Sequence, residues 1–291
     1  MHRSRTVTSG PSSSSSVAGM DRVKAVRRLS GRSARVREGR FAVEGPQAVR
    51  EAVAGPGVLA LYCTDDAARR HPEILAAARE RGTEPVRVSD DVMAAMTDTV
   101  TPQGLLAVCR LVDVPLEDVV ALRPRLVAVL AHVRDPGNAG TVIRAADAAG
   151  ADAVVLTDAS VDPHNPKCVR STAGSLFHLP VVTGVPLAQA VAALRGAGCT
   201  VYAADGAGDV DLDDLADAAE DARRSGTGAG AGLSGRVAWV FGNEAWGLPQ
   251  EDRALADAVV RVPVHGRAES LNLGTAATVC LYAAARAHRA G

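Results

Sequence analysis

RVAWVFGNEAWGLPQ, residues 236–250, is the stretch that decides the fold of this 291-residue chain. Its apolar run at residues 237–241 predicts a buried strand, which ends at Gly242, Asn243 and Glu244. Open α/β sheets bind ligands at the loops that follow the carboxyl ends of their strands. We therefore expect Gly242, which lets a backbone approach a ligand closely, and the carboxylate of Glu244 at the edge of a pocket.

The stretch VPVHGRAESLNLGTAA, residues 262–277, repeats this plan. We expect a strand at residues 259–264 and, after a short loop, an apolar helix over residues 270–288. Ser270 is well suited to be the N-cap of this helix, whereas Asn272 has less local reason to stand there. The two loops are close in sequence, so we predict that they wall one pocket.

The composition is typical of a soluble globular chain of one large or two ordinary domains, with 47% hydrophobic and 22% charged residues. The formal net charge is −1 at pH 7, but it is unevenly distributed. Residues 1–40 are strongly basic, with only Asp21 and Glu38 against the arginines, while residues 205–221 are almost purely acidic. The basic excess favours an arm that follows nucleic-acid phosphates, and a solvated helix face is the alternative.

Five scattered cysteines without a C-x-x-C pair predict reduced structural thiols in a cytoplasmic protein. No apolar segment approaches the roughly 20 residues that cross a bilayer. The basic N-terminus lacks the hydrophobic run of a secretory signal. His132, His164, His178 and His265 are not spaced as metal ligands, and only His265 is expected beside the pocket. We therefore expect no membrane segment and no metal site.

Alternating strand and helix patterns predict an α/β fold with two domains. Residues 1–20 are expected to be a disordered tail, because a serine-rich segment cannot bury enough apolar area. We expect a first domain at residues 21–112, a linker at residues 113–124 and a second domain at residues 125–291.

Residues 205–235 interrupt this alternation with acidic and then glycine-rich sequence, and we interpret them as a dispensable surface insertion. They include a G-x-G-x-x-G pattern at Gly230, Gly232 and Gly235. These glycines precede a strand and no helix follows them, which argues against a dinucleotide site and a nicotinamide-dependent oxidoreductase.

A third segment, DPGNAGTVIRAADAAGA at residues 135–151, places a turn and a helix after a buried strand. Asn138 is a good N-cap for that helix. Arg144 stands among apolar residues, so its guanidinium must be solvated or paired, and a simple surface arginine is the alternative to a functional one. For Glu244 the alternative is capping of the helix near Pro249.

These three segments resemble the three motifs of the SpoU/TrmH class of RNA ribose 2′-O-methyltransferases, in the SPOUT superfamily. REGRFAVEGPQAVREAV, residues 37–53, resembles the N-terminal substrate-binding domain of many of these enzymes, a domain similar to a small ribosomal-protein-type RNA-binding fold. The resemblance implies a small N-terminal ribosomal-protein-like α/β domain and a C-terminal SPOUT α/β domain with a deep trefoil knot.

The resemblance also implies a site for S-adenosylmethionine and a ring of catalytic residues. The cofactor would lie against the loops that carry Gly242, Asn243, Val262 and Leu271. The catalytic residues would be Arg144, Asn138, Glu244, Ser270 and Asn272. Because a guanidinium stays protonated in proteins, we expect Arg144 to bind a substrate phosphate and to position the hydroxyl.

Ribosomal RNA of the 23S type is the favoured substrate, because members of the class with the added N-terminal domain act mostly on ribosomal RNA. The expected RNA-binding residues are Arg27, Arg28, Arg32, Arg35, Arg37 and Arg170. A homodimer is expected through the last helix and the helix of the first motif. Its predicted contact stripe is Leu273, Ala276, Ala277, Cys280, Leu281 and Ala284.

Two other functions remain open. One is methylation of transfer RNA, and the other is a catalytically silent RNA-binding or ribosome-assembly protein on the same scaffold. The second would be free to lose Arg144 or Glu244, and both residues are present.

Overall fold

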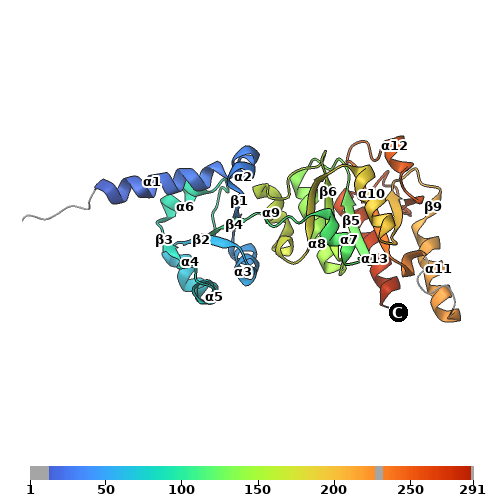
Figure 1. The fold of residues 1–291 in the computed structure, drawn as a ribbon, viewed down its shortest axis with the longest axis horizontal. Helices are drawn as coiled ribbons and strands as arrows, with labels where there is room; N and C mark the ends of the chain where they lie inside the picture. The colour runs from blue at the N-terminus through green and yellow to red at the C-terminus, as the bar shows by residue number, and fades with distance from the viewer. Residues whose placement is uncertain (1–12, 227–231, 290–291) are drawn as a thin grey trace, which may run out of the picture.

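A computed structural model describes residues 13–226 and 232–289 and divides them into two α/β units (Figure 1). The units lie side by side along the long axis, and helix α1 (Ser13–Arg28) extends from the N-terminal unit (Figure 1). The predicted α/β class is confirmed. The predicted disordered tail at residues 1–20 is wrong from Ser13 onward, where the backbone is helical, and its first part lies outside the described residues.

The N-terminal unit is built on a mixed sheet with the strand order β1-β4-β2-β3. Its strands are β1 (Arg40–Glu44), β2 (Val58–Cys63), β3 (Val86–Arg87) and β4 (Leu105–Arg110). β4 pairs antiparallel with β1 and β2, and β2 pairs parallel with β3. Because side chains alternate along a strand, Phe41 and Val43 join one apolar cluster and Ala42 joins another.

Helices cover both faces of this sheet. Besides α1 they are α2 (Arg32–Glu38), α3 (Pro46–Ala54), α4 (Asp65–Arg70), α5 (Pro72–Glu80) and α6 (Asp90–Met96). Buried residues of α3 and α5 share a cluster with Phe41 and Val43. On the other face, Val26 and Leu29 of α1 pack with α6. The basic arm is therefore anchored to the N-terminal unit by its apolar positions.

The C-terminal unit holds a parallel sheet with the strand order β7-β6-β5-β10-β8-β11-β9. The strands are β5 (Leu126–Leu130), β6 (Ala153–Thr157), β7 (Val181–Val185), β8 (Thr200–Ala204), β9 (Val210–Asp211), β10 (Val237–Phe241) and β11 (Ala258–Arg261). β10 lies in the middle, between β5 and β8, and all of its residues are buried. Continuous burial is what a parallel strand covered on both faces requires.

The elements around this sheet include seven α-helices and two short 3-10 turns within the described ranges. They are α7 (Leu116–Ala121), α8 (Pro136–Ala148), α9 (Pro166–Thr172), η1 (Ser175–Phe177), α10 (Leu187–Gly196), α11 (Leu212–Ser225), η2 (Gly232–Ser234), α12 (Gln250–Arg253) and α13 (Leu273–His288). Buried residues of α8, α9 and α13 form one cluster with one face of the sheet. α7 and α10 form the cluster on the other face.

The segment predicted as a linker, residues 113–124, contains helix α7. Leu116 and Val119 of this helix are buried in the second cluster of the C-terminal unit. Asp113 makes a parallel bridge with Val181, beside strand β7. Most of the segment is therefore part of the second unit.

The described part of the segment predicted as a surface insertion, residues 205–226 and 232–235, is instead part of the fold. β9 pairs with β11 at the edge of the sheet, and α11 packs on α13. Leu212, Ala219 and Leu233 are buried in the main apolar cluster. The acidic residues belong to the exposed side of an amphipathic helix, and their abundance hides its apolar face in the sequence.

Most of the residues of α13 that were predicted to contact a second copy pack within the same chain instead. Ala277, Cys280, Leu281 and Ala284 are buried against α8 and the sheet, so that stripe is wrong as a free surface. The exposed apolar residues of α13 are instead Val279 and Tyr282.

The two units share one apolar cluster where they meet. Phe41 of β1 is fully buried and stacks on Phe177 of η1, with ring centroids 6.1 Å apart. The ring of His164, also in the C-terminal unit, lies 4.7 Å from that of Phe41. The first strand of the chain thus packs against a segment more than a hundred residues later.

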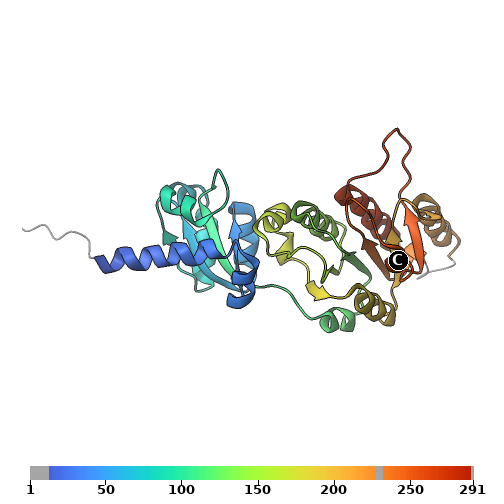
Figure 2. The ribbon, with the colours of Figure 1, turned by 90° about the horizontal axis from the view of Figure 1, so that it is seen from above.

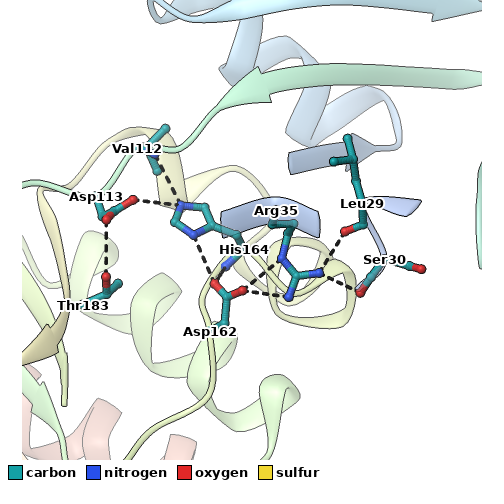
Figure 3. Close-up of polar contacts among 8 residues, drawn as sticks. All are labelled: Leu29, Ser30, Arg35, Val112, Asp113, Asp162, His164 and Thr183. Atoms are coloured by element: carbon teal, nitrogen blue, oxygen red, sulfur yellow. Dashed lines mark hydrogen bonds and ion pairs between the residues drawn. The ribbon is translucent and has the colours of Figure 1, made fainter. Parts of the chain in front are cut away.

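Polar side chains complete this junction (Figure 3). Arg35 of α2 donates from Nη1 to the carbonyl oxygens of Leu29 and Ser30, at 2.8 and 2.7 Å, and binds Asp162 with its other nitrogens. Asp162 also accepts from the backbone N–H of His164 at 2.8 Å. The backbone N–H of Val112 donates to Nε2 of His164 at 3.3 Å, which leaves Nδ1 to donate to Asp162.

Candidate active site

The carboxyl end of β10 is followed by a tight turn. The N–H of Asn243 donates to the carbonyl of Gly247, and the N–H of Gly247 donates to that of Asn243, both at 2.9 Å. A Cβ on Gly242 would lie 2.6 Å from the carbonyl carbon of Gly247, so the turn can close only over a glycine. Gly247 has a φ of 68°, a conformation that glycine adopts readily. The turn exposes Glu244, Ala245 and Trp246 at its tip.

A second loop faces this turn. It joins β11 to α13 and extends away from the sheet (Figure 2). Together the two loops border a cavity of about 760 Å³. The predicted residues along its wall are Gly242, Asn243, Glu244, Val262, Ser270 and Leu271. The structure thus brings all four residues predicted to bind the cofactor to one cavity, as the sequence pattern suggests.

One hydrogen-bonded chain links residues from all three motifs at the edge of this cavity. Nδ2 of Asn138 donates to Oε1 of Glu244 at 3.2 Å. Nδ2 of Asn272 donates to Oδ1 of Asn138 at 3.1 Å. The amide of Asn138 therefore uses both its donor and its acceptor to join two other loops. Ser270 lies at the same cavity, exposed to solvent.

The helix caps differ from those predicted. Asp135, and not Asn138, is the N-cap of α8, with its Oδ1 accepting from the N–H of Asn138 at 2.8 Å. Asn272, and not Ser270, is the N-cap of α13, with its Oδ1 accepting from the N–H of Gly274 at 2.8 Å. Capping by Asp135 frees the side chain of Asn138 for Glu244. Capping by Asn272 fixes the amide that it offers to Asn138.

Asp135 and Lys167 are site residues that the sequence analysis missed. Nζ of Lys167 lies 2.8 Å from Oδ2 of Asp135, and this hydrogen bond, with that from Asn138, lowers the pKa of Asp135 below its usual value. The pair holds the start of α9 against the start of α8. The only signal in the sequence is that Lys167 is one of two lysines, which does not identify its partner.

Arg144 lies on the exposed side of α8, nearly two helix turns beyond Asn138. No hydrogen bond or ion pair joins its guanidinium to any other residue in the described ranges. Arg134, just before the N-cap of α8, is also exposed and likewise has no such partner in the part of the chain that is described. Both guanidinium groups are therefore available to an external anion.

The predicted RNA-binding arginines fall into distinct environments. Arg28 and Arg32 are exposed, Arg27 makes only a 3.4 Å contact to the carbonyl of Ala95, and Arg37 pairs with Glu38. Arg170 lies 3.5 Å from Glu44 across the junction. Arg35 is only 2% exposed and ion-paired, so its prediction as an RNA contact is wrong.

His265, which was predicted beside the pocket, and the five cysteines do not line the cavity. His265 is exposed, 3.7 Å from Asp213. No group of histidine, cysteine or acidic residues in the described part of the chain has the geometry of a metal site. All five cysteines are free and buried, and burial raises the pKa of the Cys109 thiol to about 12. Among the described residues no helix is long and apolar enough to cross a membrane.

The fold and the site define an α/β protein that holds a small ligand at the carboxyl ends of a parallel sheet, beside free cationic groups on the surface. The model of the SpoU rRNA Methylase family matches residues 125–282, and the chain belongs to this family. The MRM3-like substrate binding domain matches residues 21–107.

Individual relatives match almost the whole chain. The 23S rRNA (guanosine(2553)-2′-O)-methyltransferase RlmP of Bacillus subtilis is 33% identical over 261 residues, which cover 90% of this chain and 94% of that protein. A 23S rRNA (uridine(2479)-2′-O)-methyltransferase of Streptomyces viridochromogenes is 32% identical over 90% of this chain and 88% of its own. The crystal structure of an AdoMet-bound rRNA methyltransferase from Sinorhizobium meliloti matches with a TM-score of 0.75 and 31% identity, over 91% of this chain and 94% of that one.

Proposed function

We propose that this protein transfers a methyl group from S-adenosylmethionine to a ribose 2′-hydroxyl of 23S-type ribosomal RNA. The observation that carries the proposal is the chain Asn272–Asn138–Glu244 at the mouth of the cavity. It joins the three family motifs into one polar network beside the cavity wall. The names of the full-length relatives support the same reaction and the same class of RNA.

The cavity suits the cofactor in size and chemistry. Its volume falls in the range of about 300 to 1,000 Å³ that small-molecule sites occupy. Apolar walls from Phe241 and Leu271 stand beside the carboxylate of Glu269, which complements a cationic sulfonium ligand. The residues that would hold the cofactor are Gly242, Asn243, Val262 and Leu271. When bound, the cofactor supplies a methyl group on a good leaving group.

The protein then has to orient the hydroxyl and to help it lose its proton. Arg144 would bind a phosphate of the RNA with its planar guanidinium, which stays protonated. Glu244 offers a carboxylate that can accept a hydrogen bond from the ribose hydroxyl. Asn138 holds that carboxylate in place through its own amide, and Asn272 holds Asn138. Ser270 would complete the ring from the cavity side.

The N-terminal unit would bind the RNA outside the reacting nucleotide. The match to a substrate binding domain over residues 21–107 supports this role. A ribosomal-protein-like fold for the unit remains a proposal that its small mixed sheet supports. Exposed Arg28 and Arg32 on one side, and Arg170 at the junction, would contact the phosphates.

We also propose the deep trefoil knot, a homodimer and a cytoplasmic location for this chain. The return of α13 onto α8, with Gly274 beside Thr141, supports a threaded C-terminus. Exposed Val279 and Tyr282 on α13 support a dimer face next to α8. Five buried free thiols fit a reducing compartment.

Mapping of ribose methylation at nucleotide resolution tests the function. The unmodified 23S RNA transcript is incubated with S-adenosylmethionine and the wild-type protein or the Arg144→Ala variant. We expect one modified position with the wild type and none with the variant, while both bind the cofactor in calorimetry. Methylation of bulk transfer RNA and not of the 23S transcript would favour the transfer RNA alternative. Binding of RNA without any methylation would favour the silent RNA-binding protein.

A further inference from the structure

Trp246 is an exposed aromatic residue at the mouth of the cofactor cavity. Its side chain is 49% exposed, whereas the other tryptophan of the chain, Trp239, is fully buried. It stands at the tip of the turn closed by Asn243 and Gly247, two residues after Glu244. Tryptophan is enriched at binding surfaces, because its ring offers a large apolar area and its N–H a polar contact.

The indole packs against a histidine that is itself held in place by hydrogen bonds. Its ring lies 5.4 Å from the imidazole of His132, at an angle of 47°. Nε2 of His132 is 2.7 Å from Oδ2 of Asp252, and the carbonyl of His132 accepts from Nδ2 of Asn243 at 2.9 Å. The backbone of His132 has a φ of 60°, which is uncommon for a residue other than glycine. The ring is therefore presented on a braced support.

Trp246 lies on the part of the site that is open to solvent, where an RNA substrate would approach. All of these turn residues border the cavity, but Gly242 and Asn243 are buried, while Trp246 is on the exposed tip with Glu244. Arg134 follows His132 by two residues and is exposed without a hydrogen bond or ion pair to another described residue. An aromatic ring for a base beside a guanidinium for a phosphate is a common arrangement for single-stranded nucleic acid.

We propose that the indole of Trp246 is a stacking platform for an unpaired base of the substrate RNA, next to the methylated ribose, with Arg134 as the neighbouring phosphate contact. The inference rests on the proposed function. Stacking on the braced ring would fix the nucleotide relative to Glu244 and Asn138. Trp246 is thus a substrate-positioning residue at the rim of the cofactor cavity.

Measurements of RNA and cofactor binding on the full-length protein test this inference. With the unmodified 23S transcript, we expect Trp246→Ala to raise the Kd and the KM for RNA about 5- to 150-fold. Affinity for S-adenosylmethionine should stay within about twofold. Trp246→Phe should recover most of the loss, because a smaller ring still stacks. The fluorescence of Trp246 in the wild type should be quenched when the transcript binds, and this signal should be absent from Trp246→Phe.

Leu122→Ala is the matched control, because it removes a 75% exposed apolar side chain from the same unit away from the cavity. It should change neither the affinity for RNA nor that for S-adenosylmethionine.

Weaker cofactor binding by Trp246→Ala with unchanged RNA binding would overturn the proposal and make the ring a cover for the cofactor. A monomeric Trp246→Ala beside a dimeric wild type would make it an interface between copies. Unchanged RNA binding in a folded variant would also overturn it, even if the wild type methylates the transcript. A wild type that binds neither cofactor nor transcript would instead refute the proposed function.

Discussion

Arg35 and Asp162 form a charged pair between the two units of the chain, although 127 residues separate them in the sequence. Nε and Nη2 of Arg35 donate to the same oxygen, Oδ2 of Asp162, at 2.9 and 2.7 Å (Figure 3). The arginine is 2% exposed and the carboxylate 12%. The pair therefore joins the segment that matches the substrate-binding domain to the segment that matches the methylase family.

Arg35→Ala should destabilise the protein by about 3 to 5 kcal/mol, because it leaves the buried carboxylate of Asp162 without its charged partner. Urea unfolding measures this loss. Arg37→Ala is the control on the same helix, since Arg37 is 65% exposed, and it should cost no more than about 1 kcal/mol. If the two variants unfold alike, the pair does not hold the units together.

The same pair predicts a dependence on pH. Burial by itself would raise the pKa of Asp162, but hydrogen bonds from His164 and Arg35 outweigh it and lower that pKa overall. A lowered folded-state pKa contributes stability above the unfolded value of about 3.9, and this contribution is lost as the pH falls below it. The stability difference between wild type and Asp162→Asn should therefore shrink below about pH 4. A constant difference from pH 3 to pH 7 would contradict this.

Arg144→Ala should leave the fold and the affinity for S-adenosylmethionine nearly unchanged, because Arg144 is exposed and lies outside the cavity wall. Its turnover on the 23S transcript should fall at least about 100-fold, since a poorly placed substrate reacts slowly. Arg144→Lys should recover little, because an ammonium lacks the planar fork. Arg286→Ala, another exposed arginine, is the control. Substantial turnover by Arg144→Ala at saturating RNA would rule out the assigned role.

The convergence of the three motifs could be predicted from the sequence, because their strands are parallel and each motif follows a strand's carboxyl end. The hydrogen bonds of the Asn138 side chain could not be predicted from the sequence. Its role depends on Asp135 taking the N-cap, which two good capping residues three positions apart leave undecided. Sequence patterns also gave no sign that Arg35, one of many arginines, would be buried, because its partner lies in a distant loop.

Helix α11 shows why the composition of residues 205–235 favours a surface insertion, although the segment packs on the core. Leu212, Leu215 and Ala219 recur at helical spacing, but the acidic residues between them dominate the segment. Similarly, α13 is apolar around much of its surface, so the sequence does not predict which face of the helix is buried within the chain. Packing against α8 decides this, through contacts more than a hundred residues apart.

Leu212→Ala should destabilise the protein by about 2 to 5 kcal/mol, because Leu212 is buried in the main cluster where α11 begins. Asp217→Ala changes an exposed residue of the same helix and should stay within about 0.5 kcal/mol. Thermal unfolding compares the two. A Leu212→Ala protein as stable as the wild type would restore the interpretation of this segment as a dispensable insertion.

The basic helices of the N-terminal unit should make RNA binding depend on salt. Each phosphate contact that an arginine makes contributes about 0.7 to 0.9 to the slope of log affinity against log salt concentration. Arg28 and Arg32 are exposed, with no hydrogen bond or ion pair to another residue of the described ranges, so both are free to make such contacts. Deletion of residues 1–40 would also remove buried Leu29 and Arg35, so substitutions give the cleaner test.

Arg28→Gln and Arg32→Gln should each lower the slope by up to this amount on the 23S transcript, and the double variant should lower it by the sum. Arg224→Gln, on acidic helix α11, should leave the slope unchanged, and none of these variants should alter affinity for S-adenosylmethionine. An unchanged slope in the double variant would show that the arm does not contact RNA. Equal methylation of bulk transfer RNA by the wild type and the double variant would overturn both the role of the arm and the preference for ribosomal RNA.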